Sequence, residues 1–165
     1  MNDNDLGSSI NQVCPFCSKD VQEMAFYETT DFLAIYNIAP ILPGHSMIIT
    51  RNHIKSAMQL SDKQLADLMI FARKTTGFLL AEFSSAAFDW SLQDGEAAGQ
   101  SVPHFHLHII PRRPNDFPDD NEWYEKLPEN ESALLDSRMR NRIDEDKYQH
   151  ISSYLRKKAE TVFNF

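Results

Sequence analysis

The chain has 165 residues, 42% hydrophobic and 24% charged, which is the size and composition of one soluble globular domain. Its formal net charge of −8 argues against a general nucleic-acid or membrane-surface binder, because such binding depends on cationic side chains. The start is acidic, no apolar run reaches the about 18 residues that a membrane span needs, and there are only two cysteines, so we expect a cytoplasmic protein without membrane or nucleic-acid partners.

The first part of the chain predicts a loose end followed by three strands. Residues 1–12 are polar and predict a flexible N-terminus. The apolar residues 24–27 and 32–36 predict a hairpin, because a short polar segment separates them. Residues 47–50 are strongly apolar and predict the next strand.

A helix and two further strands are expected after this point. Ser61 and Gln64 form a capping box, and apolar residues then recur at helical spacing to about Glu82. Residues 88–92 and 104–110 alternate as strands do, and Pro111 is expected to end the second of them.

The end of the chain predicts a loop and a helix. The segment from 114 to 131 is acidic and contains prolines, which is typical of a surface loop, and the following apolar residues have the spacing of an amphipathic helix. The order of the elements favours an α+β fold with a mostly antiparallel five-stranded sheet, a central helix and a C-terminal helix.

Residues 104–110, His-Phe-His-Leu-His-Ile-Ile, are the most informative segment. Because side chains alternate between the two faces of a strand, His104, His106 and His108 share one face and apolar residues share the other. Imidazoles spaced by roughly 6–7 Å pack poorly, but they bind anionic oxygens or metals and transfer protons. A scatter of surface histidines is the alternative, although half of the six histidines fall within five positions.

The loop before this strand is built from small and polar residues. Residues 93–101 read Gln-Asp-Gly-Glu-Ala-Ala-Gly-Gln-Ser, and the glycines let backbone N–H groups approach a ligand closely. Such a loop can bind phosphate without Lys or Arg, whereas a plain hairpin turn has a similar composition. Its place directly before three aligned histidines favours a phosphate site.

These residues resemble the signature of the histidine-triad (HIT) hydrolases, in which three histidines alternate with apolar residues. The stretch from Ser91 to Arg112 is similar to the Fhit branch, the dinucleoside polyphosphate hydrolases. Asn37, Pro43-Gly44-His45 and the downstream Trp123-Tyr124-Glu125-Lys126-Leu127 match that branch as well.

The resemblance covers about residues 20–130 and implies the HIT fold. Residues 1–12 would be the flexible N-terminus and residues 13–113 the catalytic domain. Residues 114–165 would then form an acidic loop and a helix that pack on the same domain.

The resemblance also implies roles for the histidines. His106 would attack the α-phosphorus to form a nucleotidyl-histidine that water hydrolyses, with its other ring nitrogen donating to a backbone carbonyl. His108 and His45 would bind phosphate oxygens, and His108 stands where the family's nucleotidyl transferases have Gln, which favours water as the acceptor. Nucleotide contacts would come from Asn37 at the ribose and from Gln93, Gly99, Gln100 and Ser101 near the phosphates.

Two of these nucleotide contacts have simpler alternatives. Asn37 could be a turn residue before Pro40, and Gln93 could be an amide that satisfies the end of a strand.

Cys14-Pro15-Phe16-Cys17 is a CxxC pair, which can chelate Zn²⁺, but a structural site needs four ligands. The sequence has no second such pair, so the other ligands would be distant histidines, with His53 and His104 as candidates. Zinc-bearing HIT proteins have this arrangement, which implies a structural zinc on Cys14, Cys17, His53 and His104, whereas the Fhit branch generally lacks the cysteines. A redox pair and two unligated thiols are the alternatives.

The expected function is hydrolysis of nucleotide phosphoanhydrides, such as diadenosine tri- or tetraphosphate, to AMP and a second nucleotide. A Hint-like nucleoside phosphoramidase using the same His106 and a non-catalytic nucleotide-binding module are the alternatives. The sequence leaves open whether Mg²⁺ accompanies the polyphosphate.

Family members are usually homodimers that join through the central helix and a strand. A homodimer is therefore expected here, with four residues of the helix partly interfacial: Leu65, Leu68, Met69 and Phe71.

Overall fold

The computed structural model describes residues 14–116 and 140–164. The predicted flexible N-terminus (residues 1–12), the Trp123-Tyr124 pair and most of the acidic loop lie outside these ranges. Within them, neither the long helices nor the short ones combine the length and the apolarity that crossing a bilayer requires.

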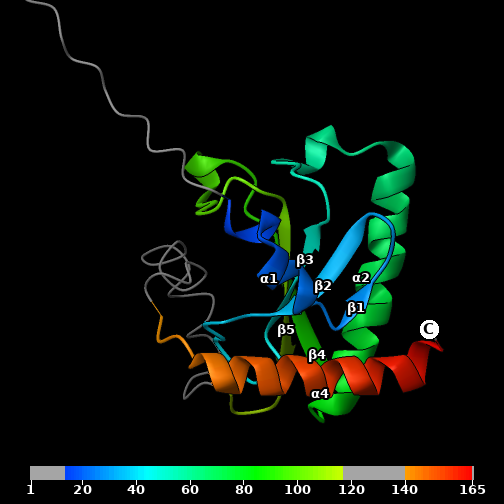
Figure 1. Cartoon of the computed structure of the whole chain (residues 1–165), viewed down its shortest axis with the longest axis vertical. Coiled ribbons are helices and arrows are strands. Elements are labelled where there is room, and N and C mark those ends of the chain that lie inside the picture. The colour runs from blue at the N-terminus through cyan, green and yellow to red at the C-terminus, as the bar shows by residue number, and fades with distance from the viewer. Residues whose placement is uncertain (1–13, 117–139, 165) are drawn as a thin grey trace, which may run out of the picture.

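The described residues fold around a five-stranded sheet in which all neighbouring strands are antiparallel (Figure 1). In the order β1-β2-β3-β5-β4, the strands are β1 (Tyr27–Glu28), β2 (Phe32–Tyr36), β3 (Ser46–Thr50), β5 (His106–Arg112) and β4 (Ala87–Ser91). The predicted α+β fold is confirmed, and the histidine-bearing strand β5 lies inside the sheet between β3 and β4.

The described residues also form three α-helices, which are α1 (Lys19–Glu23), α2 (Asp62–Glu82) and α4 (Glu145–Phe163). The predicted capping box starts α2, because the Gln64 N–H donates to the Ser61 hydroxyl and the Ser61 N–H donates to the Gln64 side chain. The sequence does not predict α1 or the single turns of 3-10 helix, since such short elements have no helical periodicity. These turns are Pro15–Cys17, Ala57–Gln59 and Glu96–Ala98.

The main core lies between one face of the sheet and the helices α2 and α4 (Figure 1). Phe105, Leu107 and Ile109 belong to this core, as the alternation predicts. A smaller apolar cluster occupies the other face, and its buried members are Ala25, Leu33, Ile35, Met47 and Ile49. Because cross-strand partners share a face, the register Ile49↔His106 and Met47↔His108 places these two histidines beside the smaller cluster.

The strand β5 differs from its prediction at both ends. It begins at His106 instead of residue 104, and it continues through Pro111 to Arg112. Pairing with β3 stops at Ile109, so Pro111 has only β4 beside it. A residue without an N–H is tolerated there because one side of the strand is an edge.

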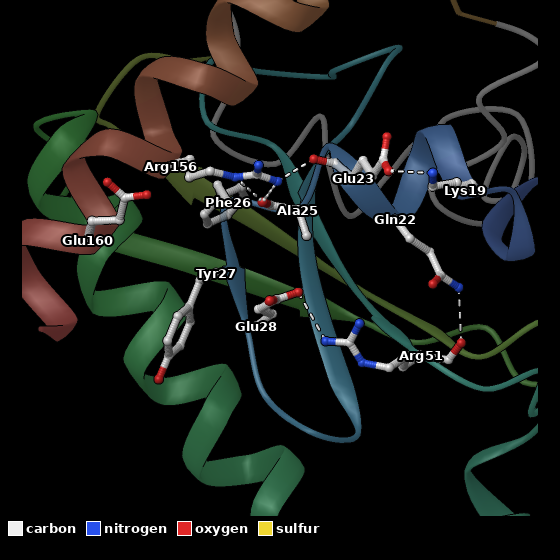
Figure 2. Close-up of a pocket in the computed structure, with 10 residues that line it drawn as sticks. All are labelled: Lys19, Gln22, Glu23, Ala25, Phe26, Tyr27, Glu28, Arg51, Arg156 and Glu160. Atoms are coloured by element: carbon white, nitrogen blue, oxygen red, sulfur yellow. Dashed lines mark hydrogen bonds and ion pairs between the residues drawn. The ribbon is translucent and has the colours of Figure 1, made fainter. Parts of the chain in front are cut away.

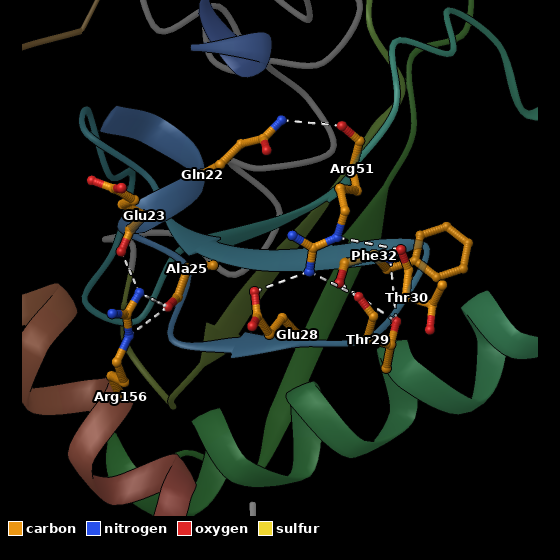
Figure 3. A network of polar contacts seen from close by, with 9 residues as sticks. All are labelled: Gln22, Glu23, Ala25, Glu28, Thr29, Thr30, Phe32, Arg51 and Arg156. Carbon is orange, nitrogen blue, oxygen red and sulfur yellow. Dashed lines mark hydrogen bonds and ion pairs between the residues drawn. The ribbon is translucent and has the colours of Figure 1, made fainter. Parts of the chain in front are cut away.

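Two arginines hold the edge of the sheet at β1 (Figure 3). Arg156 of α4 donates to the carbonyl oxygens of Ala25 and Glu23. Arg51, directly after β3, donates to the carbonyl of Thr29 at 3.0 Å and pairs with Glu28 at 3.0 Å. These side chains border a cavity of about 490 Å³ between α1, β1 and α4, and none of the histidines lines it (Figure 2).

Candidate active site

The ring of His106 is held in one orientation by the backbone. Its Nδ1 lies 2.7 Å from the carbonyl oxygen of His104, which can only accept a hydrogen bond, so Nδ1 carries the proton. In the neutral ring the lone pair is therefore on Nε2, for which the described residues offer no hydrogen-bond partner. The bond to a backbone carbonyl that the resemblance implies is present, and it leaves a basic nitrogen ready to react.

A second chain of hydrogen bonds sets the protons on His45 and His108. The Ile41 N–H donates to His45 Nδ1 at 3.0 Å, so the proton of neutral His45 is on Nε2. That nitrogen lies 2.9 Å from His108 Nδ1, which must then accept. Neutral His108 consequently carries its proton on Nε2, the nitrogen on the far side of its ring.

Burial keeps all three rings neutral. It is the main cause that lowers the pKa of His106, and it lowers the pKa of His45 and His108 well below their usual 6.5. The positive charge of Arg140 lowers the pKa of His45 further. The pKa of His108 is lowered further by His45, by His106 and by Arg140, in that order. At neutral pH the site therefore combines an unprotonated nitrogen on His106 with an N–H donor on His108.

The three rings are packed closely enough to act on one small group. The ring centres of His106 and His108 are 5.2 Å apart with planes at 82°, and those of His45 and His108 are 5.1 Å apart. A lone pair beside an N–H donor suits attack on an electrophilic atom that carries an anionic oxygen, because the donor stabilises charge that develops on that oxygen.

Phe16, between the two cysteines, covers part of this site. Its ring meets the rings of His106 and His104 edge-on, with centres 5.4 Å and 5.6 Å apart. His106 is only 4% exposed as a consequence of this and its neighbours in the sheet. Because Nδ1 is bonded to the His104 carbonyl, Nε2 is the ring nitrogen left for a reaction partner.

Asn37 and Gln93 lie beside the histidines. Asn37 is fully buried, accepts from the Ala39 N–H at 2.9 Å, and places Nδ2 3.3 Å from His45 Nε2. Gln93 is nearly buried and donates to the hydroxyl of Ser91, the residue paired with His108 across the sheet. The structure thus brings both predicted residues to the site, with their amides bonded to the protein.

In the loop that precedes β5, two residues have backbone conformations that favour glycine. Gly95 and Gly99 have φ of 94° and 88°, at the two ends of the turn Glu96–Ala98. Ser101 follows, half-buried, and Gln100 turns its amide toward the backbone, where it bonds to Gly95, Lys55 and His104. The predicted phosphate contacts of Gly99, Gln100 and Ser101 stay predictions.

Next to the triad, the predicted Cys and His ligands form one cluster. Cys17 Sγ lies 3.2 Å from His53 Nδ1, and Cys14 Sγ lies 3.4 Å from His104 Nδ1. The four ligand atoms are all within 4.8 Å of one another, close to the about 4 Å that separates tetrahedral ligands of one zinc. Across residues 14–116 and 140–164, this is the one such cluster of His, Cys, Asp or Glu side chains.

Thr50 orients His104 toward the cysteines. His104 Nε2 lies 2.8 Å from the Thr50 carbonyl oxygen, so this nitrogen carries the proton and Nδ1 keeps its lone pair. Metal-binding histidines usually donate their second ring nitrogen to a carbonyl or carboxylate in this way. The residues present therefore fit a metal of the zinc type.

The sequence does not reveal the parts played by Thr50 and Arg140. Arg140 donates to the Ala39 carbonyl at 2.5 Å, which brings its charge to the loop that carries His45. The Ile143 N–H donates to the Ile38 carbonyl at 2.9 Å, which is a second hydrogen bond between the same two segments. Both contacts join segments about a hundred residues apart, and no local pattern in either segment signals them.

Comparison with known proteins agrees with this geometry. A model of the HIT domain matches residues 18–115, a range that contains all the histidines of the site but neither cysteine. The chain is 38% identical over 119 residues to the bis(5'-nucleosyl)-tetraphosphatase [asymmetrical] of Schizosaccharomyces pombe, and the matched region covers 72% of this chain and 65% of that protein. It is 30% identical over 106 residues to the bis(5'-adenosyl)-triphosphatase of Dictyostelium discoideum, covering 64% and 71%.

Among solved structures, the NitFhit protein of C. elegans matches with a TM-score of 0.63 and 26% identity, covering 81% of this chain and 27% of that one. The chain thus spans less than two thirds of the S. pombe and C. elegans proteins.

Proposed function

This chain belongs to the HIT domain family, and from that premise we propose that it hydrolyses dinucleoside polyphosphates to AMP and a second nucleotide. The names of the S. pombe and Dictyostelium relatives support this substrate class. The observation that carries the proposal is the lone pair on His106 Nε2, which the bond to the His104 carbonyl leaves free, on a ring whose centre lies 5.2 Å from that of the N–H donor His108.

The reaction we propose has two steps. His106 Nε2 attacks the α-phosphorus, a P–N bond forms, and the P–O bond to the rest of the polyphosphate breaks with its electrons on the departing oxygen. Water then attacks the same phosphorus, the P–N bond breaks with its electrons returning to Nε2, and AMP leaves while the proton of the water passes to solvent. The His104 carbonyl stabilises the charged ring of the intermediate through the Nδ1–H.

His108 and His45 act on the phosphate oxygens in this proposal. The Nε2–H of His108 donates to a non-bridging oxygen, and His45 fixes that proton through its own bond to His108 Nδ1. Asn37 is proposed to bind the ribose hydroxyls, and Gln93, Gly99 and Ser101 to contact the phosphates.

A direct test compares two substrates on the purified protein. Hydrolysis of diadenosine triphosphate with release of AMP is expected, and it should be faster than hydrolysis of an AMP-amine with a P–N bond. The reverse preference would identify a phosphoramidase. Binding of AMP without turnover of either substrate would identify a nucleotide-binding module, so each outcome selects one of the three functions.

We also propose that Cys14, Cys17, His53 and His104 hold a structural Zn²⁺. The spacing of their ligand atoms and the bond from His104 to Thr50 support the proposal. A closed tetrahedral site would tie together the N-terminal turn, the loop after β3 and the segment directly before β5. Zinc bound to thiolates suits a reduced compartment, and we place the protein in the cytoplasm for that reason.

A homodimer is proposed through α2 and the edge strand β4. Met69 and Ile70 on α2 are 52% and 49% exposed, and Phe88 and Leu92 at β4 are 44% and 41% exposed. Leu65 is also partly exposed, whereas Leu68 and Phe71 pack in the core and are not available to a partner. Sedimentation of the double variant Met69→Glu, Phe88→Glu should show monomers, and Val162→Glu on α4 should sediment as the wild type does.

A further inference from the structure

We propose that Gln100 positions the nucleophile instead of binding phosphate: its side-chain amide fixes the His104 carbonyl that orients His106. This inference rests on the proposed function, because it assigns a task within the same site. It departs from the role that the sequence suggests for Gln100.

The amide of Gln100 joins three backbone segments. Its Oε1 accepts from the Gly95 N–H at 2.9 Å, while its Nε2 donates to the carbonyl oxygens of Lys55 at 2.8 Å and His104 at 3.3 Å. A primary amide has two N–H groups, which is enough to donate to both carbonyls. A contact with phosphate would have to replace one of these bonds.

The His104 carbonyl needs this support because it lies outside the strand ladder. β5 begins at His106, and its pairing with β3 begins at Ile49↔His106. The N–H of the same peptide, on Phe105, is bonded to the Ile54 carbonyl at 2.6 Å. Gln100 holds the carbonyl side of that peptide, so together the two contacts set the peptide plane.

The direction of this carbonyl decides where the lone pair of His106 points. The oxygen has two lone pairs, of which one receives the Nδ1–H of His106 at 2.7 Å and the other receives Gln100. If the carbonyl rotates, the Nδ1–H loses its acceptor, and the tautomer with the proton on Nε2 becomes accessible. That tautomer has no lone pair at the position where attack occurs.

The two roles for Gln100 predict different kinetic effects. A positioning residue acts on the chemical step, so its loss lowers kcat and changes KM little. A phosphate ligand acts on binding, so its loss raises KM, and the effect should depend on the number of phosphates. Misplacement of a reacting group can lower a rate about 100-fold.

The test uses Gln100→Ala and Gln100→Glu in the full-length, metal-loaded protein at neutral pH. Gln100→Glu keeps the size of the side chain and an acceptor for Gly95, but it removes both donors. We expect kcat for diadenosine triphosphate to fall about 10- to 100-fold in both variants, with KM changed less than about 3-fold. Glu96→Ala, an exposed residue of the same loop, is the matched control and should leave both constants unchanged.

A spectroscopic readout decides the inference without any turnover. In ligand-free protein, long-range ¹H–¹⁵N spectra should show His106 with its proton on Nδ1, identified by the loss of its signals in His106→Asn. In the Gln100 variants the Nε2–H form should appear. If neither tautomer nor kcat changes, or if only KM rises, Gln100 does not position His106. If the wild type fails to hydrolyse the substrate but the tautomer still depends on Gln100, the proposed function is wrong, while the positioning of the His106 ring by Gln100 stands.

Discussion

His45 Nε2 lies 2.9 Å from His108 Nδ1, and this bond is the middle of a chain that starts at the backbone N–H of Ile41. Because a backbone N–H can only donate, the chain has one possible direction when both rings are neutral. The loop after β2 therefore determines which nitrogen of a histidine on β5 carries a proton. A donor at His108 Nε2 is the result, beside the lone pair of His106.

Replacing His106 should abolish catalysis. His106→Ala removes the proposed nucleophile, so kcat should fall by at least about four orders of magnitude, while a non-hydrolysable dinucleotide should still bind. Mass spectrometry of rapidly quenched wild-type protein should show an added AMP on His106, absent from the variant. Persistent turnover by His106→Ala would show that another group attacks phosphorus.

His45→Ala should slow the reaction by breaking the chain to His108. The proton of His108 is then no longer directed to Nε2, and we expect kcat to fall about 100- to 1,000-fold, as when an oriented donor is removed from an active site. His150→Ala, on an exposed part of α4, is the matched control and should have wild-type kinetics. Equal rates in both variants would rule out the proposed role of His45.

The buried histidines predict loss of stability in acid. His45 and His108 have a folded-state pKa well below 6.5, mainly through burial, so the unfolded chain binds more protons once the pH falls below about 6.5. Their contribution is complete above that pH and is lost as the pH falls toward the folded-state pKa. Urea unfolding across this range should show a free energy of unfolding that decreases as the pH is lowered.

Arg140→Gln tests the charge that acts on these two histidines. Without the guanidinium their pKa should rise, so the acid limb of the kcat profile should move to higher pH. The acid loss of stability from these two groups should become smaller at the same time. An unshifted dependence of kcat on pH would mean that the charge of Arg140 does not affect the pKa of the active-site histidines.

Removal of the metal should destabilise the fold. His53→Ala, or a chelator added to the wild type, should reduce bound zinc below one per chain and lower Tm by about 10 °C, as expected for loss of ~3 kcal/mol in a protein of this size. Asn52→Ala, the exposed neighbour, should retain zinc and Tm. Metal content is measured by mass spectrometry and Tm by calorimetry, and a metal-free wild type with the same Tm would contradict the zinc proposal.

Gly44→Ala should be strongly destabilising, because Gly44 has φ of 92° and a Cβ there would lie 2.9 Å from carbons of Phe83 and Pro111. A cost of about 2 kcal/mol in the free energy of unfolding is expected. Gly77 lies within a helix, and a Cβ there would have no atom within 4 Å other than those of neighbouring helix residues. Gly77→Ala should therefore raise the free energy of unfolding by up to about 1 kcal/mol. Chemical denaturation of both variants checks the opposite signs.

The sequence by itself determined the features that depend on neighbouring residues. The alternation of histidine and apolar residues in 104–110 placed Phe105, Leu107 and Ile109 in the core, and the capping box at Ser61 placed the start of α2. Both follow from the period of a strand or the chemistry of a helix end, which a few consecutive residues specify. The resemblance to the HIT family added residues far from the histidine strand.

Only the tertiary structure decided what each side chain contacts. His45 meets His108 across 63 residues, and Cys14 meets His104 across 90. Gln100 illustrates the difference, because its sequence position suggests a phosphate ligand whereas its amide bonds to Lys55, Gly95 and His104. Such contacts depend on strand order, on register and on where β5 begins, which are properties of the packed chain, so no local pattern encodes them.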